Sequence, residues 1–96
     1  MSRFLLQRAQ RWWMQARRVE VIEVIQTQGS VPREAGTWMM VSPREVIGTI
    51  GGGHLEHQAM ADARGRLAGA PGEPQVRYAL GPALGQCCGG VVHLQF

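Results

Sequence analysis

Clusters of glycine and proline divide this chain of 96 residues into short segments, and this division limits the fold most strongly. Such clusters mark turns, so each helix or strand must fit between two of them. Segments of strand-type composition predict strands at 19–26, 37–42, 45–50, 75–80 and 91–96. Apolar residues at helical spacing predict helices at 3–16 and 54–67. This order predicts the α+β class, with a small mixed β-sheet of about five strands and two helices packed on it.

The first predicted helix is amphipathic and basic. It contains Trp12 and Trp13, and five of the ten arginines of the chain precede Glu20. Such a helix either lies on a membrane surface or a partner protein, or packs its tryptophan face on the sheet; we favour the second arrangement. Because two adjacent tryptophans cannot both point to the centre, we expect one of them to be an exposed contact.

Length and composition exclude several classes of protein. The hydrophobic fraction of 45% and the short chain indicate one small globular domain. No apolar run approaches the roughly 18–20 residues that cross a bilayer, and no signal peptide is visible, so we expect a cytoplasmic protein with reduced thiols. A net charge of +3 is too small to indicate nucleic-acid binding. We expect neither nucleic acid nor a membrane among the partners.

Both cysteines, Cys87 and Cys88, are adjacent and stand between Gly85 and Gly89. A zinc site needs four ligands, and paired cysteines at the usual spacing are missing. A disulfide between neighbouring cysteines is strained and is unexpected in the cytoplasm. Buried, inert thiols remain an alternative. We favour reactive or ligating thiols, because the flanking glycines let a bulky group approach and sulfur suits a thiophilic metal.

A second glycine run, Gly51, Gly52 and Gly53, separates a predicted strand from a predicted helix. Backbone amides of such a run can surround an anion at the positive end of a helix, and a tight turn that needs small residues is the alternative. The run matches neither the dinucleotide-binding fingerprint nor the P-loop. The nearby group of His54, Glu56 and His57 lacks the spacing of a zinc protease, and helix polarity accounts for an acidic residue in the first turn.

Arg33 lies in a predicted loop that also contains Gly29, Pro32 and Gly36. Loops held by a rigid sheet often carry binding residues, and a guanidinium can bind a phosphate through two hydrogen bonds. A salt bridge on the protein surface is the alternative explanation for Arg33.

Three segments, in one order, resemble the XdhC/CoxI family: GSVPREAG at 29–36, GTIGGGHLE at 48–56 and LGPALGQCCGG at 80–90. Members of this family are accessory proteins of xanthine dehydrogenase and related molybdenum hydroxylases. The resemblance implies a maturation factor that binds the molybdenum cofactor, or molybdopterin, as cargo. It also implies that the sulfurated cofactor passes to an apo xanthine dehydrogenase-type hydroxylase, in cooperation with a cysteine desulfurase.

The resemblance also suggests which residues bind the cofactor. It carries over Cys87 and Cys88 as residues that handle the cofactor or its sulfur, with a molybdenum contact through the cofactor, and Gly89 lies beside them. From chemistry rather than from the family, we expect the anionic end of the cofactor to meet Arg33, Gly51, Gly52 and Gly53.

Three roles stay open at this point. The leading one is an accessory protein without turnover, and the second is a transferase that carries a persulfide on Cys87 or Cys88. The third is an interaction module that docks through the helix of Trp12 and Trp13.

We expect residues 1–96 to form a single domain of the XdhC/CoxI type, with 1–18 as its amphipathic helix. Family members usually continue into a Rossmann-like C-terminal domain, which this sequence lacks. The chain is therefore expected to be a fragment, a short form, or a protein that completes its site as a homodimer, which an exposed tryptophan face makes plausible.

Overall fold

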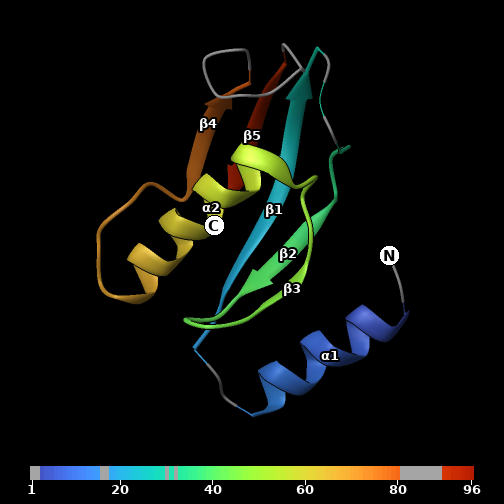
Figure 1. Cartoon of the computed structure of the whole chain (residues 1–96), viewed down its shortest axis with the longest axis vertical. Helices are drawn as coiled ribbons and strands as arrows, with labels where there is room; N and C mark the ends of the chain where they lie inside the picture. The colour runs from blue at the N-terminus through green and yellow to red at the C-terminus, as the bar shows by residue number, and fades with distance from the viewer. Residues whose placement is uncertain (1–2, 16–17, 30, 32, 81–89) are drawn as a thin grey trace.

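The computed structural model describes residues 3–15, 18–29, 31, 33–80 and 90–96 (Figure 1). The order of helices and strands matches the prediction from sequence. Every predicted boundary lies within two residues of the observed one. The elements are α1 (Arg3–Met14), β1 (Glu20–Gln28), β2 (Trp38–Val41), β3 (Val46–Gly48), α2 (Gly53–Leu67), β4 (Gln75–Ala79) and β5 (Val91–Gln95).

The five strands form one sheet in the order β3-β2-β1-β5-β4. The predicted α+β class, the five strands and the two helices are confirmed. The sheet differs from the prediction in one respect, because all four pairings are antiparallel and the sheet is therefore not mixed. The reason lies in the crossover through α2, which joins the two edge strands β3 and β4. These two strands run in the same direction, but three other strands separate them, so they never pair.

The larger core lies between the sheet and α2. Helix α2 buries one stripe of small and apolar side chains at helical spacing, namely Leu55, Ala59, Ala63 and Leu67. Alternate residues of the strands meet this stripe, and Ile22, Met39 and Leu94 are fully buried there. The core therefore fixes the register of the central strands against α2.

A smaller core lies on the opposite face of the sheet, under α1. Met39 and Met40 are neighbours on β2, and they belong to the two different cores, as the alternation of a strand requires. Trp12 of α1 is 5% exposed and packs here with Met40 and Ile47, whereas Trp13 is 72% exposed. The prediction that the helix packs on the sheet and leaves one tryptophan exposed is confirmed.

A polar contact ties α2 to β4 beneath the larger core. The Tyr78 hydroxyl donates a hydrogen bond to the carboxylate of Asp62 on α2. Burial raises the pKa of Tyr78 far above its usual value of 10.0, and the hydrogen bond and negative charge of Asp62 raise it further. Within the described part of the chain, no helix has the length and apolar character needed to cross a membrane.

Candidate functional site

The residues expected to handle sulfur, Cys87, Cys88 and Gly89, lie outside the residues that the structure describes. The described residues on either side are Leu80 and Gly90, and they are joined by a hydrogen bond of 2.8 Å from the Leu80 amide to the Gly90 carbonyl. The cysteine segment, residues 81–89, therefore connects the paired strands β4 and β5. The hydrogen bonding between the two strands continues up to the residues that flank this segment.

The pairing of the strands brings the Arg33 loop to the same end of the sheet. Gln28, the last residue of β1, pairs with Val91, and Val91 pairs with Ala79. The chain leaves β1 here to form the loop that carries Arg33, beside the strand ends that flank the cysteine segment. The N-terminal end of α2 is the end of that helix nearer to the arrowheads of β1 and β4 (Figure 1). The Arg33 motif and the cysteine motif thus start from the same end of the sheet.

The loop around Arg33 is anchored on both sides. Val31 packs against the larger core, and the Gly36 amide donates a 2.8 Å hydrogen bond to the Val24 carbonyl of β1. Arg33 itself is exposed, and none of the described carboxylates forms an ion pair with it. The anchored loop therefore presents to solvent a guanidinium that has no ionic partner among the described residues, and this arrangement suits binding of a phosphate or carboxylate.

Two hollows border the Arg33 side chain. One has a volume of about 460 Å³ and is lined by Thr27, Val31, Arg33 and Glu34. The other has a volume of about 310 Å³ and is lined by residues 33–38. A hydroxyl, a guanidinium and a carboxylate thus meet at the first hollow, which suits a polar ligand better than an apolar one.

The glycine run forms a turn that only glycine adopts easily. The φ angles of Gly51, Gly52 and Gly53 are 124°, 76° and 65°, and Gly52 is the N-cap of α2. All three angles lie in the region that L-residues with a side chain rarely adopt. The turn is therefore built from glycine for conformational reasons, whether or not it binds a ligand.

A carboxylate of the protein itself already lies in this turn. Oε1 of Glu56 accepts hydrogen bonds from the Ile50 amide at 3.0 Å, from the Gly52 amide at 3.3 Å and from the Thr49 hydroxyl. The Gly51 amide donates to the Thr49 hydroxyl oxygen at 3.0 Å. An external anion at Gly52 would have to displace Glu56. Of the two anion-binding positions expected from the sequence, Arg33 presents its donors to solvent, whereas the Gly51 and Gly52 amides already donate to acceptors of the chain itself.

The contact of Glu56 was missed at the level of sequence. Helix polarity explains an acidic residue in the first turn, but it does not predict that the side chain reaches back to Thr49 and Ile50. One sequence signal could have indicated this contact. Glu56 follows the N-cap Gly52 by four residues, a spacing close to that of a capping box, in which an acidic side chain reaches back to the backbone at the start of the helix. Among the described residues, no three or more His, Cys, Asp or Glu side chains are grouped closely enough to hold a metal ion.

Comparison with known protein families gives a match. No curated protein and no solved structure matches the chain significantly. The model of the XdhC and CoxI family matches residues 12–79, which contain the Arg33 loop and the glycine turn and end before the cysteine segment. The match covers more than half of the 96 residues. The chain therefore belongs to the XdhC and CoxI family, which indicates involvement in the maturation of xanthine dehydrogenase-type enzymes.

Proposed function

We propose that this protein binds the molybdenum cofactor as cargo and assists its sulfuration and insertion into a xanthine dehydrogenase-type hydroxylase. The observation that carries the proposal is the family match over residues 12–79, which includes the Arg33 loop. The antiparallel pairing of β1, β5 and β4 supports it, because this pairing starts the Arg33 loop and the cysteine segment at one end of the sheet.

The donors at this end suit the two chemically different ends of the cofactor. The cofactor carries a terminal phosphate, and the exposed guanidinium of Arg33 beside a hollow of about 460 Å³ suits a phosphate. The dithiolene end carries molybdenum, for which the thiols of Cys87 and Cys88 are soft ligands. When bound, the cofactor supplies the molybdenum centre that the hydroxylase needs. The glycine turn then has a supporting role, since Glu56 uses its Gly52 amide.

The chain's own residues would bind and orient this cargo. Arg33 holds the phosphate end, and Val31 and Gly36 keep its loop in place. A cysteine desulfurase would supply the sulfur, and the hydroxylase would receive the loaded cofactor. The protein itself is not assigned a catalytic residue in this scheme.

The proposal is tested by anaerobic titration of the chain with molybdenum cofactor, followed by ultrafiltration and metal analysis. We expect retention near one molybdenum per chain or per dimer. We also expect less retention in Cys87→Ala, in Cys88→Ala or in both, because the thiols bind the molybdenum end. Retention that is unchanged in both single variants and in the double variant would remove the thiols from the site. No retention by the intact chain would contradict cofactor binding by this protein.

A further inference from the structure

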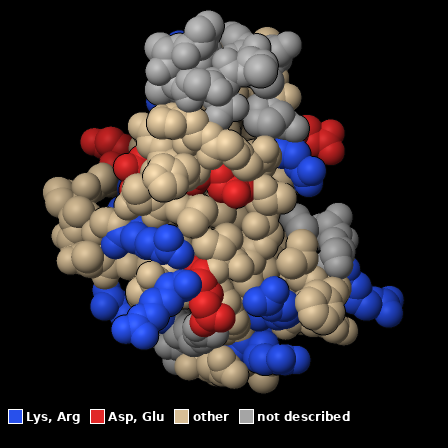
Figure 2. Space-filling view, viewed as in Figure 1, with Lys and Arg blue, Asp and Glu red and all other residues tan. Residues whose placement is uncertain are grey.

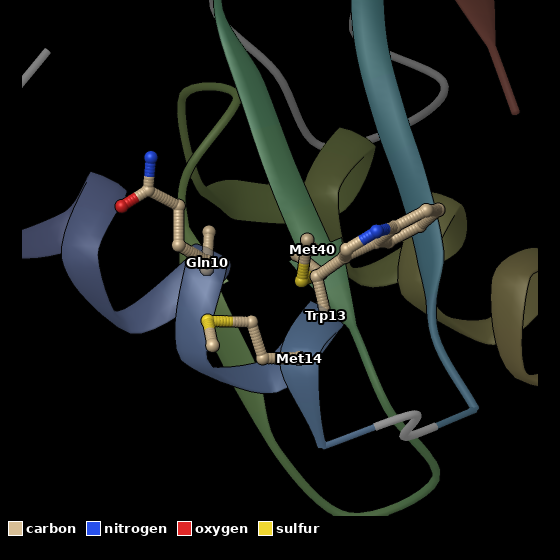
Figure 3. Close-up of a pocket in the computed structure, with 5 residues that line it drawn as sticks. Gln10, Trp13, Met14 and Met40 are labelled. Atoms are coloured by element: carbon tan, nitrogen blue, oxygen red, sulfur yellow. The ribbon is translucent and has the colours of Figure 1, made fainter.

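The surface between α1 and β2 is hollowed and apolar, and its lining shares no residue with the two hollows beside Arg33. The groove has a volume of about 430 Å³ and is lined by Ala9, Gln10, Trp13, Met14 and Met40. Figure 3 shows Gln10, Trp13 and Met14 of α1 arranged around Met40 of β2. Trp13 and Met14 are 72% and 84% exposed, so two large apolar side chains of α1 are in contact with solvent and are not buried by the fold.

Beside the groove, an apolar row of the sheet continues onto β1. Ile47, Met40 and Val21 form one row across β3, β2 and β1. Their exposed fractions are 1%, 6% and 40%, so the cover that α1 provides ends at β2. The apolar surface therefore continues past the helix onto the uncovered part of the sheet, as a trough between a helix and a strand.

The segment that contains α1, which forms one wall of the groove, is strongly basic. Residues 1–18 contain five arginines and no acidic residue, whereas residues 19–96 contain five arginines and seven acidic residues. Figure 2 shows basic side chains over the region of α1 and also over the side of α2, where acidic side chains lie among them. An occupant of the groove would gain most from carboxylates at its rim, because these would meet a concentrated positive charge.

Two other occupants fit these observations less well. A membrane would lie on the solvent-facing ridge of α1 that borders the groove beside Met14, but that ridge carries Arg3, Gln7 and Arg11, which are all exposed. A lipid surface is flat, whereas the apolar side chains here line a hollow. A second copy packed groove to groove would bring two arginine-rich helices together, which costs free energy through repulsion of like charges.

We propose that the groove between α1 and β2 docks an acidic amphipathic segment of a partner protein. A bulky apolar side chain of that segment enters the groove beside Trp13 and Met40, and its carboxylates face the arginines of α1. This follows the general mode in which an apolar face of a segment lies in a groove of its receptor. The inference does not use the cofactor, so it stands or fails independently of cofactor binding.

The test is selection of helical peptides from a random displayed library against the intact chain. We expect the selected peptides to combine acidic residues with bulky apolar residues at helical spacing. Synthetic copies should bind at least about tenfold more weakly to Trp13→Ala, as expected for a central aromatic anchor. They should also bind more weakly to Arg11→Glu and at higher ionic strength.

Matched controls separate the groove from the rest of the surface. Phe4 is 66% exposed on α1 but does not line the groove, and Arg77 is exposed on β4, so Phe4→Ala and Arg77→Glu should bind the peptides like the unaltered chain. Circular dichroism and melting of each variant verify that it is folded. Peptides without acidic enrichment, or equal binding to Trp13→Ala, would overturn the proposal.

Two further measurements distinguish the other occupants. Cosedimentation with vesicles of phosphatidylcholine and phosphatidylserine that is lost in Trp13→Ala would overturn the proposal in favour of a lipid surface. A dimer in analytical ultracentrifugation that is lost in Trp13→Ala would overturn it in favour of a second copy. Absence of both, with Trp13-dependent binding of acidic peptides, supports the proposal.

Discussion

Glu56 shows how a single side chain changes the meaning of a sequence motif. The glycine run at Gly51–Gly53 has the composition of an anion-binding turn, yet the Gly52 amide donates to Glu56. The carboxylate occupies the position that a ligand would take, and it joins the first turn of α2 to Thr49 and Ile50. At this position the anion is part of the fold.

Removal of Glu56 should therefore destabilise the protein. We expect Glu56→Ala to lower the free energy of unfolding by about 1–3 kcal/mol, because it leaves partly buried amides of Ile50 and Gly52 without this acceptor. Denaturant unfolding measures the change. Glu73→Ala is the control, because Glu73 is exposed and should change stability by less than about 0.5 kcal/mol. Equal effects of the two substitutions would contradict the role given to Glu56.

Tyr78 makes stability depend on alkaline pH. Burial and Asp62 raise the pKa of Tyr78 in the folded protein above its usual value of 10.0, so the unfolded chain loses this proton first as the pH rises. The contribution of Tyr78 to stability is therefore complete below pH 10.0. It is lost as the pH rises from there toward the folded-state pKa.

We expect the free energy of unfolding to fall above pH 10.0, and to fall less steeply in Tyr78→Phe. The test is clean because Tyr78 is the only tyrosine and the chain has no lysine. Denaturant unfolding at a series of alkaline pH values gives the two slopes. The same slope in both proteins would show that Tyr78 does not control the alkaline transition.

At the scale of elements, local sequence signals predict most of the secondary structure. The glycine and proline clusters limit each segment, so both helices and all five strands are predicted close to their observed positions. Strand β1 extends to Gln28, two residues beyond the predicted end. An irregularity between Val24 and Gln26 shifts the register there and lets polar residues continue the pairing with β5.

Helix α1 depends on one tryptophan for its attachment to the sheet. Trp12 is 5% exposed and packs with Met40 and Ile47, whereas Trp13 is 72% exposed. We expect Trp12→Ala to destabilise the protein by about 3–5 kcal/mol, or to release α1 from the sheet, because the substitution leaves a cavity. Trp13→Ala should change stability by about 0.5 kcal/mol or less. Thermal melting gives the stabilities, and hydrogen exchange in α1 reports its release.

These two variants form a matched pair of adjacent residues. If Trp12→Ala and Trp13→Ala lowered stability by equal amounts, the packing of α1 described above would be wrong. The sequence predicts that the two differ, but only the packing of α1 against β2 and β3 shows which one is buried.

At the scale of the whole molecule, the order of the strands could not be predicted from sequence. Hydrophobic pattern and turn residues act over a few positions, whereas the pairing of β1 with both β2 and β5 joins residues far apart in the chain. The expected mixed sheet proved antiparallel for this reason. The candidate site shares this origin, because pairing of Gln28 with Val91 brings the Arg33 loop beside the ends of β4 and β5.

The same distinction applies to the site residues. Arg33 was expected from sequence to bind an anion, and its exposure and lack of a described ionic partner agree with that role. The role of Glu56 depends on where backbone amides point, which a sequence pattern does not record. The roles of Cys87 and Cys88 stay predictions, since these residues lie outside the described part of the chain.

The central claim is that the loop of Arg33 binds the phosphate end of the molybdenum cofactor. The most direct measurement compares the affinity of the chain for the cofactor and for its dephosphorylated form, in the unaltered protein, in Arg33→Ala and in Arg44→Ala. Arg44 is the control, because it is exposed in the turn between β2 and β3.

We predict that the unaltered chain and Arg44→Ala prefer the phosphorylated cofactor by about tenfold or more, as expected for hydrogen bonds to a charged group. Arg33→Ala should lose this preference. If Arg33→Ala kept the same preference as the unaltered chain, the phosphate would not bind at this loop and the proposed site would be wrong.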